Sequence, residues 1–335
     1  MRAGRVIDGK VWAAFRRTFA KDDAGTLDPR HHLAKFRDGY GMAMYWDTLA
    51  RWIPQRACRD ARGLGVPLVF LQAADECNTL DKEGAQRLLN VPNFHHTGHI
   101  HGVLPAHVGM RVRFAIKLNS TLGLVQEQKA TIVGFLFEHS DQARYLACAP
   151  GEIFRPRFQP AGIWLQVDKF VESPTADEAM PFLGHPDGSP DDSDQRERAR
   201  GLLFFKPVEV EFKWRSSETH TIRRIGFPLT HERFLTSTAC QGQTIRTGVT
   251  IDCARIEPAG KQGASDEQWW LHLYVMLSRT TCMEDMLLLR PPPRDLLERG
   301  PPVAIREALA AFEQKVADSV EAARALAASM GIAVP

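Results

Sequence analysis

One stretch of the sequence combines hydrogen-bonding side chains, a bare glycine and an arginine in an order suited to phosphate chemistry. Gln241, Gly242 and Thr244 lie in a polar, turn-like segment. A glycine there allows backbone N–H groups to approach a phosphate closely. Arg279 follows at the end of an expected helix. Because its guanidinium is always charged and planar, it can bind a phosphate through two hydrogen bonds.

A strand, a helix and a second strand would have to position these two points. Residues 248–256 (GVTIDCARI) alternate apolar and polar side chains, as a half-buried strand does. Ser265 can cap a helix over residues 265–279, with Gln268 completing a capping box. Apolar residues recur in that helix at helical spacing: Trp269, Trp270, Leu273, Tyr274 and Leu277. Residues 283–289 form a short apolar run that suits a buried strand. This order predicts a βαβ unit of a parallel sheet.

Two motifs in this region resemble the C-terminal motor motifs of superfamily-one DNA helicases of the RecD-like, PIF-type branch. The first family motif is approximately T-x-H-K-x-Q-G-x-T, and the second is Y-V-A-L-S-R. For the first, the chain has Thr236, Gln241, Gly242 and Thr244 in place, with Thr238 and Ala239 where the family has His and Lys. For the second, it has Y-V-M-L-S-R from Tyr274 to Arg279.

The resemblance implies roles for these residues. In the family, two RecA-like domains hold ATP between them, and single-stranded DNA crosses both. Arg279 would be the arginine finger of the second domain. Gln241 and Gly242 would line the nucleotide cleft, while Thr236 and Thr244 would contact DNA phosphates or hold the loop. Two simpler interpretations stay open: Arg279 can complement the dipole at a helix C-terminus, and Gly242 can be an ordinary turn glycine.

A second block of sequence resembles the same family. Residues 104–119 alternate, which predicts one strand with a buried apolar face. Its other face carries Arg111, Arg113 and Lys117, which we expect to bind a nucleic-acid backbone. In the family the corresponding block leads into a small β-barrel insertion of SH3-like type. Here Gln126-Glu127 replaces the Asn-Gly turn, which supplies positive φ more readily.

The predicted fold class is α/β: a RecA-like parallel-sheet domain with a small SH3-like β-barrel insertion and flanking helices. We expect a mainly helical segment over 1–62 and the RecA-like domain over 63–122 and 226–292. The insertion would cover 123–225, with a disordered loop near 185–201. An amphipathic helix is expected within 293–335, packed on the domain or on a partner.

The sequence contains no G-x-x-x-x-G-K-[ST] segment, so it lacks a Walker A motif. Asp75-Glu76 follows the apolar residues 66–71 and imitates a Walker B motif, but we expect that strand to open the second RecA-like domain. The chain alone is therefore not expected to bind or hydrolyse ATP. ATP and Mg²⁺ would belong to a complete motor, with a first RecA-like domain supplied in the same full-length chain or in trans.

The resemblance implies a role in DNA repair or recombination, with single-stranded DNA as partner. A non-catalytic nucleic-acid-binding or interaction module on the same fold is the alternative. A structural protein with accidental motif matches is a third interpretation.

Composition excludes several other classes of protein. Of the 335 residues, 44% are apolar and 24% charged, as in an ordinary globular protein, and the net charge of +2 does not by itself favour nucleic acid. Six scattered cysteines without a CxxC indicate a reducing, intracellular compartment such as nucleus or mitochondrion, and argue against a zinc site. The histidines of 95–101 predict a polar loop because Gly98 interrupts any helix that would align them as metal ligands. No apolar run reaches the roughly 18 residues of a membrane span.

Overall fold

The computed structural model describes residues 9–21, 28–77, 80–120, 124–168, 201–215, 219–254, 265–292, 294–298 and 300–330. The chain divides into two compact units, residues 1–44 with 235–335 (unit 1) and residues 45–234 (unit 2). Unit 1 contains a parallel sheet with helices, and unit 2 is built mostly from antiparallel sheets. The fold is thus mixed α/β with a parallel sheet, as predicted.

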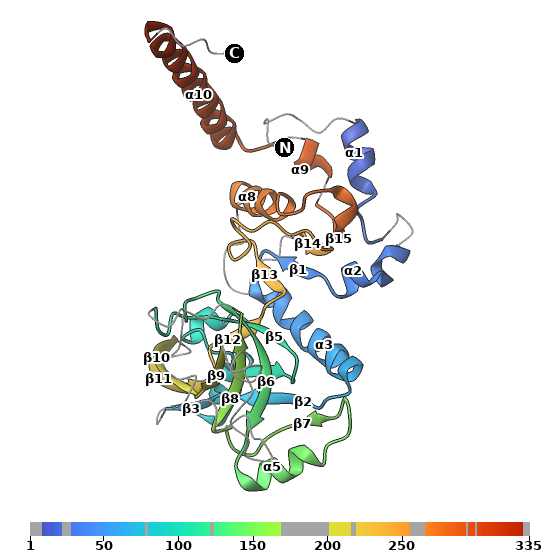
Figure 1. The fold of residues 1–335 in the computed structure, drawn as a ribbon, viewed down its shortest axis with the longest axis vertical. Helices are drawn as coiled ribbons and strands as arrows, with labels where there is room; N and C mark the ends of the chain where they lie inside the picture. The colour runs from blue at the N-terminus through green and yellow to red at the C-terminus, as the bar shows by residue number, and fades with distance from the viewer. Residues whose placement is uncertain are drawn as a thin grey trace, which may run out of the picture. The chain divides into compact units, whose positions relative to one another are not determined.

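Unit 1 is organised around a four-stranded sheet in the order β13-β1-β14-β15. Its strands are β13 (Phe234–Thr236), β1 (Tyr40–Ala43), β14 (Val249–Asp252) and β15 (Met286–Arg290). β1, β14 and β15 run parallel, and α8 (Asp266–Leu277) connects β14 to β15 and lies alongside them in Figure 1. The predicted βαβ unit is confirmed.

The local sequence explains why α8 begins and packs where it does. The Ser265 hydroxyl accepts a hydrogen bond from the Gln268 N–H at 3.1 Å, and the Gln268 side chain accepts one from the Ser265 N–H at 3.2 Å, so the predicted capping box is confirmed. Trp269, Leu273 and Met276 are buried along one side of the helix. The Trp269 indole N–H donates to the carbonyl of Cys253 at 3.1 Å, which fastens the helix beside the end of β14.

The N-terminal segment contains a strand that the sequence analysis did not predict. It includes α1 (Gly9–Arg16), a 3₁₀ turn η1 (Pro29–His32) and α2 (Ala34–Arg37), but β1 lies within the segment 1–62 that was expected to be mainly helical. A short parallel strand that is buried on both faces shows no alternation, so periodicity alone does not distinguish it from a helix. The next helix, α3 (Trp46–Leu64), begins after β1.

In its described part, unit 2 contains three sheets. A five-stranded antiparallel sheet has the order β12-β5-β6-β8-β9, with β12 (Leu229–His231), β5 (Arg111–Phe114), β6 (Lys129–Leu136), β8 (Gly162–Val167) and β9 (Leu202–Phe205). The second sheet is β4-β2-β7, with β4 (Val103–Ala106), β2 (Leu68–Gln72) and β7 (Ile153–Phe154). The third is β10-β11-β3, with β10 (Val208–Arg215), β11 (Thr219–Gly226) and β3 (Ala74–Glu76). Helical segments α4 (Lys82–Leu89), η2 (Phe94–Thr97) and α5 (His139–Leu146) complete it.

These pairings differ from the expected domain boundaries in three respects. The strand at 66–71, expected to open the RecA-like domain, is β2, and it pairs with β4 and β7 instead of with β14 or β15. The single strand expected over 104–119 is interrupted at Gly109, whose φ is +86°, and becomes β4 and β5. The five-stranded sheet extends beyond 123–225 because it recruits β5 and β12. Long-range pairing decides all three, and local periodicity carries no signal for it.

Other features of this unit match expectation. Within the range expected for the β-barrel insertion, except for Gly226, β10 and β11 pair as an antiparallel hairpin. Glu127 adopts a positive φ of 68° in the turn between β5 and β6, at the position where the family has glycine. The loop expected near 185–201 lies outside the described residues except for Gly201.

The C-terminal segment forms α9 (Arg294–Glu298) and the long α10 (Val303–Ser329), after a 3₁₀ turn η4 (Met283–Asp285) before β15. The amphipathic helix is confirmed, but the expectation that it packs on the domain is wrong, because α10 has no buried residue. Among the described residues no helix is long and apolar enough to cross a membrane. None of the six cysteines forms a disulfide.

Candidate phosphate-contact site

Arg279 lies one residue beyond the C-cap of α8. The cap is Ser278, and the Arg279 side chain folds back so that its Nε donates to the Val275 carbonyl at 2.9 Å. This bond satisfies a carbonyl at the helix end, as the dipole interpretation of Arg279 requires. Its Nη2 donates to the Ser278 hydroxyl at 2.8 Å. The side chain is therefore held in one orientation and half-buried.

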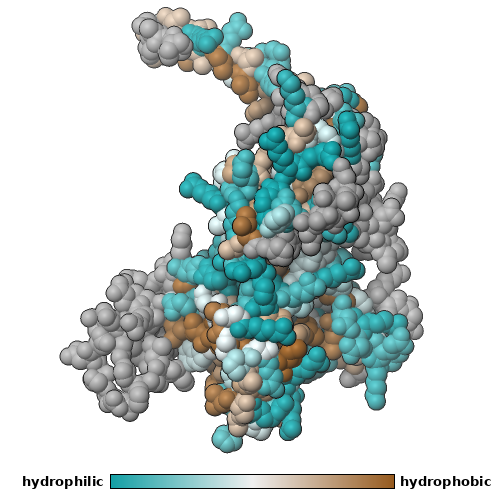
Figure 2. Space-filling model, turned by 90° about the vertical axis from the view of Figure 1, so that its right-hand side faces the viewer, coloured by the Kyte–Doolittle hydropathy of each residue, from teal (hydrophilic) through white to brown (hydrophobic). Residues whose placement is uncertain are grey.

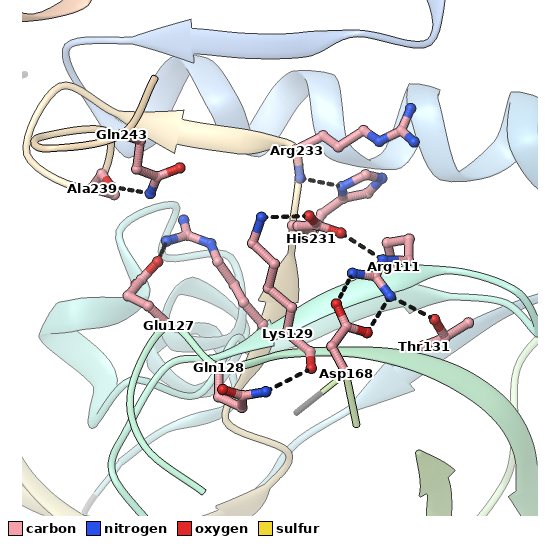
Figure 3. A network of polar contacts seen from close by, with 12 residues as sticks. Arg111, Glu127, Gln128, Lys129, Thr131, Asp168, His231, Arg233, Ala239 and Gln243 are labelled. Atoms are coloured by element: carbon pink, nitrogen blue, oxygen red, sulfur yellow. Dashed lines mark hydrogen bonds and ion pairs between the residues drawn. The ribbon is translucent and has the colours of Figure 1, made fainter. Parts of the chain in front are cut away.

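The segment before β14 folds as a compact turn with its glycine at the surface. Thr236 is buried, and its hydroxyl accepts a hydrogen bond from the Ala239 N–H at 3.3 Å, so it holds the loop from within. The Gln243 side chain donates to the Ala239 carbonyl at 2.8 Å, as Figure 3 shows. Gly242 has φ +78°, and no atom lies within 4 Å of the position that a Cβ would occupy. With Gln241 and Thr244 also exposed, the loop presents its backbone to open space.

The structure brings Arg279 and this glycine loop together. The Nη1 of Arg279 donates to the carbonyl of Gln243 at 3.2 Å, and the Ile245 N–H donates to the Arg279 carbonyl at 2.9 Å. Among the described residues the guanidinium bonds two carbonyls and one hydroxyl, and none of these partners is a carboxylate. An arginine has five N–H donors, so these three bonds leave two donors and the whole positive charge for a ligand.

The site lies at the amino edge of the parallel strands. α8 starts beyond the carboxyl end of β14 and returns to the start of β15, and Ile245 and Thr280 form a parallel bridge just before both strands. In open α/β sheets, a domain's own nucleotide site lies at the carboxyl ends of the strands. At that end of this sheet, the Asp252 carboxylate is ion-paired with Arg290. The arrangement suits a group donated to a ligand held elsewhere.

Two residues that the sequence analysis did not single out also bind the loop to the helix. The Ser237 hydroxyl and His272 Nδ1 lie 2.6 Å apart, and the Ser237 N–H donates to the Ala43 carbonyl at 3.2 Å. Burial lowers the pKa of His272 below its ordinary value, which favours the neutral ring that can accept the hydroxyl proton. Sequence pattern gives no signal for this contact, because the two residues are joined only by the fold.

The basic strand residues are placed differently from the expectation. Arg111 binds both oxygens of Asp168, with its Nη1 at 2.6 Å, and its Nε binds Glu232 at 2.7 Å (Figure 3). Lys129 adds a second cation to this cluster at 2.8 Å from Glu232. These carboxylates raise the pKa of Arg111 above its ordinary value. Its fork is therefore already occupied by internal partners.

Arg113 is buried between two buried neighbours on β5, so strict alternation fails along this strand, and Lys117 lies beyond its end and is exposed. Arg113 forms an ion pair with Glu127, donates to the Phe234 carbonyl at 3.0 Å and lies over the ring of Trp46. Of the three basic residues expected to contact a nucleic-acid backbone, Lys117 is the one whose side chain faces solvent.

The two acidic residues that imitate a Walker B motif are paired inside unit 2. Asp75 receives two hydrogen bonds from Arg224 at 2.6 Å each, and Glu76 pairs with Arg223 at 3.1 Å. Their placement on β3 explains the resemblance without a metal. In the histidine-rich segment, His95 and His99 approach to 2.9 Å between their Nδ1 atoms. Within the described residues no group of three or more candidate ligands surrounds a metal position.

No protein-family model matches the sequence, and no curated protein matches it. Its fold is similar to solved structures of Pif1 helicases. The structure of Pif1 helicase from Candida albicans has 15% identity and a TM-score of 0.47, with 93% of this chain and 55% of that chain covered. Bacteroides Pif1 bound to ssDNA has 10% identity and a TM-score of 0.49, with 92% and 51% covered. The chain thus spans about half the length of the helicases to which it is similar.

Proposed function

We propose that this chain is the second half of an ATP-dependent DNA helicase motor. A first RecA-like domain, in the same longer chain or in trans, would hold ATP and Mg²⁺, and Arg279 would stabilise negative charge on the γ-phosphate. The observation that carries the proposal is the guanidinium of Arg279 beside the glycine loop, where its hydrogen-bond partners among the described residues are all neutral oxygens. A preorganised cation without a carboxylate partner stabilises developing charge without first having to break an ion pair.

The loop residues would take the two remaining roles. Gln241 and Gly242 would line the nucleotide cleft, because both are exposed next to Arg279's hydrogen-bond partner Gln243. Thr244 and Lys117, both exposed, would contact the phosphates of single-stranded DNA, while Thr236 holds the loop. Arg111 and Arg113 are left out of the proposed DNA contacts, because Arg111 binds Asp168 and Glu232 and the buried Arg113 binds Glu127.

The test is ATP turnover by the complete motor, with this chain joined to a first RecA-like domain that carries a Walker A motif. Arg279→Ala is expected to lower kcat by roughly 10³–10⁵ while nucleotide affinity changes little, since an arginine finger acts in the transition state. Arg324→Ala, an exposed arginine on α10, is the matched control and should leave kcat unchanged. An Arg279→Ala motor with normal kcat would contradict the proposal, as would DNA-stimulated ATP hydrolysis by this chain alone.

The alternative function, a nucleic-acid-binding module without catalysis, makes a different prediction for the same proteins. It requires salt-sensitive binding of single-stranded DNA by this chain alone, unaffected by nucleotide or by Arg279→Ala. Lys117 and Thr244 would be the contacts to test first, since they are the exposed members of the predicted set.

A further inference from the structure

The apolar stripe of α10 is exposed over most of its length, and Ile305 and Leu309 near its start are partly buried. Phe312, Leu326 and Met330 are 64%, 63% and 65% exposed, and Val316 is 45% exposed. A helix of 27 residues is about 40 Å long, and helices of this kind are normally stabilised by packing of their apolar face. In Figure 2, brown apolar surface runs along α10 at the top of the molecule next to teal polar surface.

The stripe follows a heptad pattern. Its positions alternate steps of four and three residues: Ile305, Leu309, Phe312, Val316, Ser319, Ala323, Leu326 and Met330. This 3.5-residue period is the pattern by which two helices interlock side chains along a seam. Ser319 is the polar residue of this stripe. It can still be buried in a seam, because its hydroxyl donates to the Lys315 carbonyl of its own helix at 2.7 Å.

The sizes of these side chains are complementary when the helix is paired with a second copy of itself in the antiparallel direction. In one register, Phe312 faces Ala323 of the second copy and Val316 faces Ser319 of the second copy. Leu309 then faces Leu326, and Ile305 faces Met330. Each large side chain at the centre meets a small one, which keeps the seam at an even thickness. A parallel pair would instead place Phe312 against Phe312 and leave successive layers of serine and alanine.

Charge is compatible with the same register. The residues flanking the seam would pair Arg306 with Ala327, Glu313 with Val320 and Lys315 with Ala322 of the second copy, so no like charges meet. The remaining charged residues lie on the outer face, where Gln314 donates to Asp318 at 2.8 Å. We infer that α10 is a self-association element that pairs antiparallel with α10 of a second copy of this chain.

The inference is tested with the whole chain by sedimentation equilibrium over a wide concentration range. The wild type is expected to form dimers. Phe312→Lys and Ala323→Glu should each weaken dimerisation by roughly tenfold or more, since each places an unpaired charge in the seam. The double variant carrying both changes should dimerise again, because lysine then faces glutamate twice. Gln314→Lys and Ala325→Glu put the same charges on the outer face and should leave dimerisation unchanged.

Circular dichroism of each variant reports whether α10 remains helical. A wild-type chain that stays monomeric at every concentration would overturn the inference, as would full dimerisation of both single variants. A helical double variant that remains monomeric would overturn the antiparallel register. This result is independent of the motor proposal, because it needs neither ATP nor DNA.

Discussion

The arginines of this chain meet oxygen atoms in two different ways. In unit 1, Arg279 bonds two carbonyls and a hydroxyl, and no carboxylate in the described part of the chain pairs with it. In unit 2, Arg111 and Arg224 each bind a carboxylate through two nitrogens. The second arrangement stabilises the fold, and the first leaves a cation without a carboxylate partner among the described residues, as the proposed role of Arg279 requires. The partner of an arginine therefore indicates its role better than its place in an alternating pattern.

The comparison predicts that the arginines of unit 2 act on stability, and the largest such effect should come from Arg224. This side chain is fully buried and lies over Phe212, and Asp75 is its carboxylate partner. Asp75→Asn would leave a buried cation without its counter-ion, which costs about 3–5 kcal/mol of unfolding free energy. Urea denaturation of the whole chain measures this.

The neighbouring pair on the same two strands is the matched control. Arg223 and Glu76 are about half exposed, so Glu76→Gln should leave the urea midpoint nearly unchanged. If Asp75→Asn and Glu76→Gln lowered the unfolding free energy equally, burial would not make the Arg224 ion pair more important than the Arg223 ion pair, and this prediction would be wrong.

Acid should lower the stability of unit 2. Burial lowers the pKa of His101 to about 3 and that of His95 to about 4, from an ordinary 6.5, and the His101 ring lies tilted against Phe94 within unit 2. Because the folded pKa values are depressed, their contribution is complete above pH 6.5 and is lost as the pH falls towards 3. We expect unit 2 to lose a few kcal/mol over this range.

Hydrogen exchange of β11 amides at decreasing pH reports the loss in unit 2. His101→Gln should flatten the pH dependence, while the exposed His139→Gln should leave it as in the wild type. An unchanged pH dependence in His101→Gln would show that other groups cause the acid sensitivity.

Arg111 offers a direct choice between a stabilising and a DNA-binding role. Because its donors bind Asp168 and Glu232, Arg111→Ala should lower the unfolding free energy by about 1–3 kcal/mol. Affinity for single-stranded DNA should not change. If Arg111 instead contacts a phosphate, affinity should fall and the dependence of log affinity on log salt should become shallower by about one. Lys117→Ala, on the same segment, serves as the comparison because that side chain is exposed.

The sequence predicted local features well where one short segment decides them. Ser265 and Gln268 predict the start of α8, and the apolar spacing after them predicts its buried face. Arg279 and Gly242 were predicted to lie side by side from motif order, and they do. The sequence could not predict the ion-pair and strand-pairing partners that come from distant segments. The acids that occupy Arg111 come from residues 168 and 232, and β1 is a strand only because β14 lies beside it.

The smallest expected effect on stability is that of Gly242→Ala. This variant tests whether the glycine serves the turn alone or also a ligand. Its φ of +78° is unfavourable for other residues, so Gly242→Ala should cost about 1–2 kcal/mol of local stability. The added methyl group meets no atom of the chain within 4 Å, so no steric term is added in the absence of a ligand. If a phosphate approaches this backbone in the complete motor, the methyl group would also obstruct the ligand. The loss in kcat/KM for ATP should then exceed the loss in stability when both are expressed as free energies. Equal losses would reduce Gly242 to a turn glycine and leave Arg279 as the sole contribution of this edge to the chemistry.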